Sequence, residues 1–322
     1  MRVVVIGGTG HTGTCLVPKL IEAGYEVAVI SRQQRPHYPT DGIGIQSAWE
    51  RVEWVEMDRV EADAAGNFGT RVLALKPDIV IDMICYQPES ARQLVEALRG
   101  RIELLVHCGS VWAGGASLQV PSTESEPRRP ICDYGRRKAE IEEYLLAEAR
   151  RGGLPGTVLR PGHMVGRGWV PVNPAANFNP QVYSELARGK EVCLPNLGME
   201  TLHHVHCDDV AQAFMLALEN RNGAVGEAFN VVSPSALTLR GYAEAVAGWF
   251  GKPANLSFHP WKEWKKTASE EDAKATWDHI LHSSFCSIEK ARKVLGYQPR
   301  YTSLEAVKES LDWLIQNGKV EV

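Results

Sequence analysis

The sequence predicts an α/β protein with a doubly wound parallel sheet and a smaller mixed α/β lobe toward the C-terminus. Short runs of Val, Ile and Leu, bounded by Gly, Pro or Asp, recur along the first half of the 322-residue chain. Continuous apolar runs of this kind are typical of strands buried on both faces. Stretches with apolar residues at helical spacing separate the runs, and strands that alternate with helices form parallel sheets.

The expected elements follow in order. Strands are predicted at residues 2–6, 25–30, 52–57, 77–84, 103–108 and 156–160. The helices between them are predicted at 12–23, 89–99 and 133–151, each followed by a glycine that can close it. Beyond residue 165 the chain is rich in Pro, Asn and Gly, and further helices are predicted at 181–188, 208–220, 238–250 and 303–317. The last helix carries Leu304, Val307, Leu311 and Leu314 on one face, so it should pack on the lobe.

The composition limits the kinds of partner. The chain has 35 Lys and Arg against 39 Asp and Glu, a net charge of -4, and no block of like charge. We therefore expect a small-molecule substrate and neither a nucleic-acid surface nor a membrane-binding face. Seven cysteines without a C-x-x-C pair favour free thiols in a reducing compartment. With no apolar run of about 18 residues and no signal peptide, the expected location is the cytoplasm.

The opening stretch MRVVVIGGTGHTG turns directly from a strand into a helix. Gly7, Gly10 and Gly13 stand three residues apart, where the turn needs positive φ and no side chain between the backbone and a bound pyrophosphate. The helix that follows would offer its amides to the phosphates. Together with His11 and Thr12, these glycines are expected to bind a dinucleotide, as in a Rossmann fold. A tight turn without a ligand is the alternative.

The end of the second strand bears on which dinucleotide binds. An NAD site would have an acidic residue there, whereas this chain has Ser31 and Arg32, followed by Arg35. Because arginine can pair with a 2'-phosphate, NADP(H) is favoured over NAD(H); an exposed arginine at a strand end is the alternative. Asp58, after the third strand, could contact the adenine amino group or simply form a turn.

Tyr134 and Lys138 stand four residues apart on a predicted helix and so share one face. They follow the fifth strand, as they do in the extended short-chain dehydrogenase/reductase family, which this chain resembles along nearly its whole length. The segments that carry the resemblance are GGTGHTG, Asp58, YGRRK, LRPGHMVG (159–166), HCDDVA (206–211) and FCSIEKARKVLGYQPR (285–300).

The resemblance implies an acid/base role for Tyr134 on a substrate oxygen, while hydride passes to or from the nicotinamide. An isolated tyrosine has a pKa near ~10, and the charge of Lys138, together with that of the nicotinamide, is expected to lower it. Lys138 is also expected to hold the nicotinamide ribose, and Arg160 to lie at the cofactor. The family's third catalytic group is a hydroxyl at the end of the fifth strand. Cys108 aligns with it and Ser110 follows two residues later on the same side, so Ser110 is expected to replace it; otherwise Cys108 is a core residue and Ser110 caps a turn.

Two departures from the family concern the substrate. His163 stands where an asparagine is expected, and Thr201-Leu202 stands where nucleotide-sugar enzymes have an arginine for the diphosphate. A substrate without a nucleotide is therefore expected. His163, His204 and Trp112 are predicted to contact it, with packed histidines as the alternative. The histidines at 203, 204 and 206 do not have convincing metal-ligand spacing, so no metal is expected.

The predicted protein is an NADP(H)-dependent enzyme that oxidises, reduces or epimerises a hydroxyl-bearing carbon of a small substrate. The alternatives are a nucleotide-sugar epimerase using NAD and a non-catalytic dinucleotide-sensing regulator. Residues 1–165 should form the dinucleotide-binding domain, joined again by 203–235, and 166–322 mainly the substrate lobe. The resemblance also implies a homodimer through the helices around 89–99 and 133–151.

Overall fold

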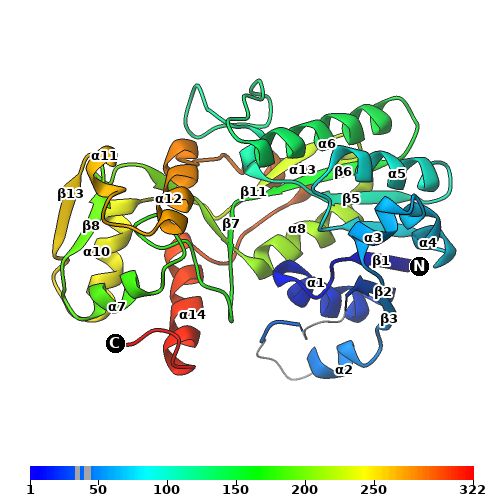
Figure 1. The fold of residues 1–322 in the computed structure, drawn as a ribbon. Helices are drawn as coiled ribbons and strands as arrows, with labels where there is room; N and C mark the ends of the chain where they lie inside the picture. The colour runs from blue at the N-terminus through cyan, green and yellow to red at the C-terminus, as the bar shows by residue number, and fades with distance from the viewer. Residues whose placement is uncertain (33–36, 40–44) are drawn as a thin grey trace.

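The computed structural model describes residues 1–32, 37–39 and 45–322, and a seven-stranded parallel sheet lies at its centre (Figure 1). The strand order is β11-β6-β5-β4-β1-β2-β3. The strands are β1 (Arg2–Ile6), β2 (Glu26–Ser31), β3 (Glu53–Glu56), β4 (Ile79–Asp82), β5 (Leu104–Cys108), β6 (Gly156–Pro161) and β11 (Ala228–Val231). The predicted doubly wound fold is confirmed, and the chain returns to the sheet at β11, next to β6.

Helices cover both faces of the sheet because its strands are apolar on both. In β1, Val3 and Val5 belong to one core cluster, whereas Val4 and Ile6 belong to the other. The first cluster includes side chains of α1 (His11–Glu22), α2 (Ile45–Trp49), α8 (Cys207–Glu219) and α13 (Glu289–Leu295). The second includes side chains of α3 (Arg59–Ala64), α4 (Phe68–Ala74), α5 (Pro88–Leu98) and α6 (Asp133–Arg150).

The smaller lobe has a core of its own, on the side of the molecule away from the N-terminus (Figure 1). Its parallel strand pair is β8 (Val192–Pro195) with β13 (Leu256–His259). Its helices are α7 (Gln181–Ala187), α10 (Leu239–Trp249), α11 (Trp261–Trp264), α12 (Glu270–His282) and α14 (Ser303–Gln316). As predicted, Val307, Leu311 and Leu314 of α14 are buried in this core, with Leu304 packed at its edge.

Two short strand pairs link the lobe to the sheet. β7 (His163–Val165) pairs in parallel with β10 (His204–His206), which sets His163 beside His204. β9 (Thr201–Leu202) pairs antiparallel with β12 (Leu237–Thr238). The remaining elements are the 3₁₀ helix η1 (Val111–Ala113) and α9 (Arg221–Ala224). In the described part of the chain, no helix combines the length and apolarity needed to cross a bilayer.

The short helices α3 and α4 were not predicted. Gly66 and Asn67 divide this stretch, so neither helix is long enough to show clear apolar periodicity. Asp58 begins α3 as its N-cap.

Candidate functional site

The glycine turn lies at the carboxyl end of β1, where helix α1 begins. Gly7 has a φ of 84° and donates its amide to the Ile30 carbonyl at 2.9 Å, which ties the turn to the end of β2. A Cβ on Gly13 would collide with the backbone of Gly8, so only glycine lets α1 approach this closely. Gly10 precedes the helix and has no side chain to cap its first amides, and the first turn of α1 contains no acidic residue. The geometry therefore suits the phosphates of a dinucleotide, drawn by the amides and the helix dipole.

The residues predicted to select the cofactor continue from β2. Ser31 is the last residue of that strand and is buried, whereas Arg32 is exposed just beyond it. The carbonyl of Ile30 accepts the amide of Gly7 in the glycine turn. Arg32 is two residues further along the chain, so it lies near the edge of the sheet where a dinucleotide would bind. Arg35 lies outside the described residues. Asp58 uses its carboxylate to accept the amides of Val60 at 2.7 Å and Glu61 at 3.2 Å, the turn-forming alternative left open by the sequence.

Aromatic rings that the sequence analysis did not identify pack beside the glycine turn. The His11 ring lies 4.4 Å from the rings of both Tyr38 and Trp169. Thr12 donates its hydroxyl to the Met164 sulfur at 3.1 Å. His11 and Thr12 are thus packed against the segment that follows β6, which joins the turn to the smaller lobe. No sequence signal distinguishes Tyr38 or Trp169 from ordinary loop aromatics.

Tyr134, Ser110 and Lys138 are brought together where β5 meets α6. The Ser110 hydroxyl lies close enough to that of Tyr134 to lower the tyrosine's pKa. Ser110 also accepts the Trp112 amide at 3.2 Å, and this cap of η1 fixes its hydroxyl. The side chain of Cys108 belongs to the hydrophobic core. The structure therefore places the Ser110 hydroxyl near Tyr134, while its catalytic role stays a prediction.

Lys138 is held below the tyrosine ring by backbone oxygens. Its ammonium donates to the carbonyls of Cys85 and Cys108, each at 2.8 Å, and only 2% of the residue is exposed. It lies 4.9 Å from the centre of the Tyr86 ring and 6.0 Å from that of Tyr134. Burial lowers the pKa of Lys138. Tyr86 and Cys85, which follow β4, were not predicted as parts of this site.

The pKa of Tyr134 is raised in the protein alone, whereas the lowering expected from Lys138 and the nicotinamide concerns the enzyme with its cofactor. Burial raises the pKa of Tyr134 above its ordinary value, and the nearby Ser110 hydroxyl only partly offsets this effect. The Lys138 ammonium donates its hydrogen bonds to the carbonyls of Cys85 and Cys108. Its charge therefore does not outweigh the effect of burial on the Tyr134 pKa. Tyr134 is thus protonated at neutral pH when the cofactor is absent.

Histidines and Trp112 form an aromatic cluster next to Tyr134. The Trp112 ring stacks on His282 at 4.0 Å and lies 5.9 Å from the Tyr134 ring. It also lies 6.3 Å from His163 and 5.4 Å from His279. Burial lowers the pKa of His163 well below its ordinary value and that of His279 to about 4. The cluster is therefore neutral near pH 7.

Hydrogen bonds fix the tautomers of the paired histidines His163 and His204. Nδ1 of His163 accepts the His203 amide at 3.2 Å, so its proton is on Nε2. Nε2 of His204 binds the Val172 carbonyl at 3.0 Å, so its Nδ1 is an acceptor. Burial lowers the pKa of His204 to about 3. Within the described residues, His163 Nε2 and His204 Nδ1 are both buried without a hydrogen-bond partner, and the two rings are 5.7 Å apart.

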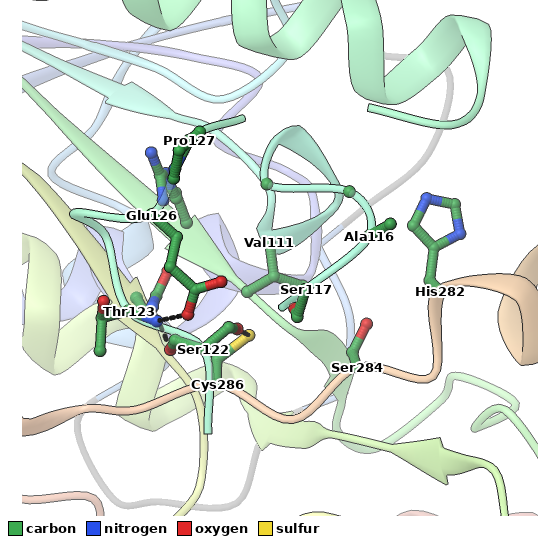
Figure 2. A pocket seen from close by; sticks show the side chains of 14 residues that line it. Val111, Ala116, Ser117, Ser122, Thr123, Glu126, Pro127, His282, Ser284 and Cys286 are labelled. Atoms are coloured by element: carbon green, nitrogen blue, oxygen red, sulfur yellow. Dashed lines mark hydrogen bonds between the residues drawn. The ribbon is translucent and has the colours of Figure 1, made fainter. Parts of the chain in front are cut away.

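Arg160 is not brought to the glycine turn. Its guanidinium forms a bidentate ion pair with Glu142 of α6, with Nε 2.6 Å from the carboxylate. β6, which carries Arg160, is separated from β1 by β5 and β4. Arg160 also lines a polar pocket beside the loop after η1, together with His282 and Ser284 (Figure 2). Because His282 also stacks on Trp112, this pocket adjoins the aromatic cluster.

The segment that would hold a diphosphate in nucleotide-sugar enzymes, Thr201-Leu202, makes packing contacts and hydrogen bonds within the protein. Leu202 is fully buried in the lobe core, and Thr201 bonds to Ser283 and Ser284. His203 bonds to the Ser233 carbonyl, and His206 contacts Glu309 at 2.7 Å. Among residues 1–32, 37–39 and 45–322, no three His, Cys, Asp or Glu side chains are grouped to hold a metal.

Comparison with known proteins identifies the family. The chain belongs to the NAD dependent epimerase/dehydratase family, whose model matches residues 3–231. This agrees with the resemblance to extended short-chain dehydrogenases/reductases. The protein is therefore an enzyme of the NAD(P)-dependent oxidoreductase and epimerase class.

Two curated relatives and one solved structure illustrate the range of similar proteins. The chain is 28% identical to 2'-dehydrokanamycin reductase of Streptomyces kanamyceticus, over 99% of this chain and 86% of the relative. It is 26% identical to chloroplast stem-loop binding protein of 41 kDa b of Arabidopsis thaliana, over 96% and 78%. UDP-glucose 4-epimerase of Thermotoga maritima, solved with UDP-glucose, has a TM-score of 0.73 and 22% identity, covering 98% of this chain and 99% of that chain.

Proposed function

We propose that the protein transfers a hydride between NADP(H) and a hydroxyl-bearing or keto carbon of a small substrate without a nucleotide, with Tyr134 as the acid/base. The placement of the Ser110 hydroxyl near that of Tyr134, beside buried Lys138, carries the proposal. The bound cofactor supplies or accepts the hydride at its nicotinamide ring.

The two hydroxyls can act on one substrate oxygen. A carbonyl oxygen within reach of both would accept two hydrogen bonds, which polarise the carbonyl as the reaction begins. Tyr134 then gives its phenolic proton to that oxygen during reduction and takes it back during oxidation. The raised pKa of Tyr134 keeps the phenolic proton in place in the free protein, where it is available for donation to a carbonyl oxygen. Lys138 would bind the nicotinamide ribose and hold the ring of Tyr134 in position.

Arg32 supports the preference for NADP(H). It is an exposed cation immediately after β2. The end of β2 is hydrogen-bonded to the glycine turn through the Ile30 carbonyl, so Arg32 lies on the same side of the sheet as that turn. A guanidinium there can pair with the 2'-phosphate, and no acidic residue takes the same position in the sequence. We propose that this contact gives NADPH the higher affinity.

The aromatic cluster supports a neutral, hydroxyl-bearing substrate. His163 Nε2 is a donor and His204 Nδ1 an acceptor, so a single hydroxyl could satisfy both. Neutral histidines provide little attraction for a diphosphate, and Leu202 replaces the expected arginine with a buried apolar side chain. The adjoining pocket, with its Ser, Thr and Asn side chains, would suit further hydroxyls.

A nucleotide-sugar epimerase using NAD is the second candidate, supported by the fold shared with the Thermotoga maritima enzyme. The fate of the cofactor separates the two. An epimerase keeps its nicotinamide unchanged over a turnover, whereas a reductase consumes external NADPH. NADPH oxidation in step with the loss of a ketone would support the first candidate.

Substitution of Tyr134 tests the proposed chemistry. Tyr134→Phe removes the proton donor but keeps the ring, so turnover should fall by a factor on the order of 10²–10⁴ with the fold and NADPH affinity retained. Tyr144→Phe is a matched control, because Tyr144 lies on the same helix, α6, and packs against the core cluster of α3, α4 and α5, away from the group around Tyr134. It should change turnover by less than about threefold. Tyr134→Phe with most of its activity intact would refute the mechanism.

We further propose a homodimer formed through α5 and α6, in the cytoplasm, without a nucleic-acid partner. The net charge of -4 supports the absence of a nucleic-acid partner and the free cysteines support the cytoplasm, whereas the dimer follows only from the family resemblance. Light scattering on the purified protein measures the oligomeric state, and a monomeric mass would reject the dimer.

A further inference from the structure

Two thiols far apart in the sequence meet where α1 packs against α8. Cys15 on α1 and Cys207, the first residue of α8, have their sulfur atoms 3.1 Å apart, although 192 positions separate them. Both helices cover the same face of the central sheet (Figure 1). Both cysteines are free thiols.

The backbone around the pair keeps the two sulfurs in contact. A Cβ on Gly166 would lie only 2.6 Å from the Cys207 sulfur, so the glycine leaves the space which that sulfur occupies. Cys207 is buried against this segment, whereas Cys15 is partly exposed. The contact is thus set by the packing of three segments from different parts of the chain, and it does not depend on a flexible loop.

The charges near the two sulfurs make them chemically different. Lys19 lies one helical turn after Cys15 and forms an ion pair with Asp208 at 2.9 Å, and Arg300 pairs with the same aspartate. The hydrogen bond between the two sulfurs lowers the pKa of Cys15, and the charges of Lys19 and Arg300 add to this effect against the opposing effects of burial and Glu309. The same hydrogen bond, together with burial, raises the pKa of Cys207. Cys15 is therefore the better nucleophile, and Cys207 keeps its proton.

Solvent reaches the pair through a surface pocket. Cys15 and Cys207 both line it, together with Lys19, Arg300 and other residues of α1 and α8. A small uncharged oxidant can therefore approach Cys15. Within the part of the chain that the structure describes, no third His, Cys, Asp or Glu side chain joins the two sulfurs in a group that could hold a metal. We therefore do not assign a metal to this pair.

We propose that Cys15 and Cys207 form an oxidisable dithiol site that reacts with peroxides. The Cys15 thiolate attacks one oxygen of hydrogen peroxide and the O–O bond breaks, which gives a sulfenic acid and, after proton uptake, one water. The Cys207 sulfur then attacks the Cys15 sulfur, the S–O bond breaks, and a second water leaves. Two thiols are oxidised to one disulfide and one peroxide is reduced to two waters. The sulfurs need to approach by about 1 Å to reach disulfide length.

This site is independent of the proposed hydride transfer, because neither cysteine belongs to the catalytic group around Tyr134. Oxidation would fasten α1, which begins at the glycine turn, to α8, which follows β10. A monothiol or dithiol reductant would reverse the bond by thiol–disulfide exchange.

Peptide mapping after peroxide treatment tests the proposal. Unmodified protein should yield a Cys15–Cys207 cross-linked peptide that dithiothreitol removes. Cys207→Ser should stop the cross-link and leave Cys15 as a sulfenic acid that dimedone captures, whereas Cys15→Ser should prevent both products. Cys193→Ser, which changes a partly exposed thiol in the other lobe, is the matched control and should leave the cross-link unchanged.

A second measurement does not depend on the variants folding. In the unmodified protein, iodoacetamide should alkylate Cys15 roughly tenfold faster than Cys193, as mass spectrometry of the two peptides would show. Equal rates, a cross-link between other cysteines, dimedone on Cys207, or no cross-link at peroxide doses that oxidise Cys193 would each overturn the proposal.

Discussion

Replacing Arg160 by methionine tests whether this arginine stabilises the fold or binds the cofactor. The Arg160 guanidinium pairs bidentately with Glu142, and both side chains are almost fully buried. Burial alone would raise the pKa of Glu142, but the hydrogen bonds and charges of Arg160 and Arg128 outweigh it and lower the pKa. Methionine fills much of the same space and leaves the Glu142 carboxylate in the core with one partner fewer.

The expected loss of stability follows from this geometry. Removing one partner of a buried ion pair typically costs about 3–5 kcal/mol, because the other charge stays buried. Arg128 still reaches Glu142, with its Nε 2.9 Å from the carboxylate, so we expect about 3 kcal/mol. At about 2.1 cal/mol/K per residue, 322 residues give an unfolding entropy of roughly 0.7 kcal/mol/K. The melting temperature should therefore fall by about 4 °C.

Urea unfolding followed by circular dichroism measures the free energy, and an NADPH titration below the transition measures affinity. We expect the Arg160→Met protein to bind NADPH as the unmodified protein does. Two further variants serve as controls. Glu142→Leu combined with Arg160→Met should recover most of the lost stability, since an apolar pair leaves no buried charge. Arg128→Met should cost less than Arg160→Met, because Arg128 is partly exposed.

A stability loss below about 1 kcal/mol for Arg160→Met would refute this reasoning. So would a weakened affinity for NADPH with unchanged stability, which would return Arg160 to the cofactor-binding role that the sequence suggested.

Three further predictions concern the cofactor, the substrate and pH. NADPH should bind at least several-fold tighter than NADH, and Arg32→Ala should narrow the gap in fluorescence titrations; equal affinities in the unmodified protein would reject the role of Arg32. UDP and GDP should show no more than weak background binding in calorimetry, because Leu202 stands in place of an arginine; micromolar binding would favour the nucleotide-sugar epimerase. Glu309 has a pKa lowered to about 2, first by His206, whose Nε2 lies 2.7 Å from the carboxylate, and, after an opposing effect of burial, by Arg167. Glu309→Gln should therefore cost roughly 1 kcal/mol above pH 4.5, and the difference should disappear as the pH falls from 4.5 toward 2; a difference that does not change with pH would contradict it.

The sheet could be predicted from sequence because each strand carries its own signal. β1 and β4 are short apolar runs buried on both faces, and helices α1 and α5 are followed by Gly24 and Gly100, both with positive φ. α3 and α4 could not be predicted in this way, since each is shorter than two apolar repeats. Their helical state depends on packing against α5 and on the Asp58 cap.

The catalytic group was only partly predictable. Strand alternation places Cys108 and Ser110 on the same side, and the weak donor strength of a thiol favours Ser110. The direction of the Tyr134 pKa shift could not be predicted from sequence, since it depends chiefly on how deeply the folded chain buries the hydroxyl. Tyr86, which lies over Lys138, comes from the loop after β4 and has no sequence signal of its own.

The segment LRPGHMVG (159–166) shows why a contiguous motif need not form one contiguous site. An extended chain advances about 3.3 Å per residue and alternates its side chains, so residues of one motif face different surroundings. Arg160 reaches Glu142 on α6, His163 pairs with His204 at the aromatic cluster, and Met164 accepts the hydroxyl of Thr12 at the glycine turn. The motif therefore connects the sheet, the aromatic cluster and the glycine turn. The expectation that Arg160 lies at the cofactor could not foresee its ion pair with Glu142, because only the tertiary contacts of each residue separate these roles.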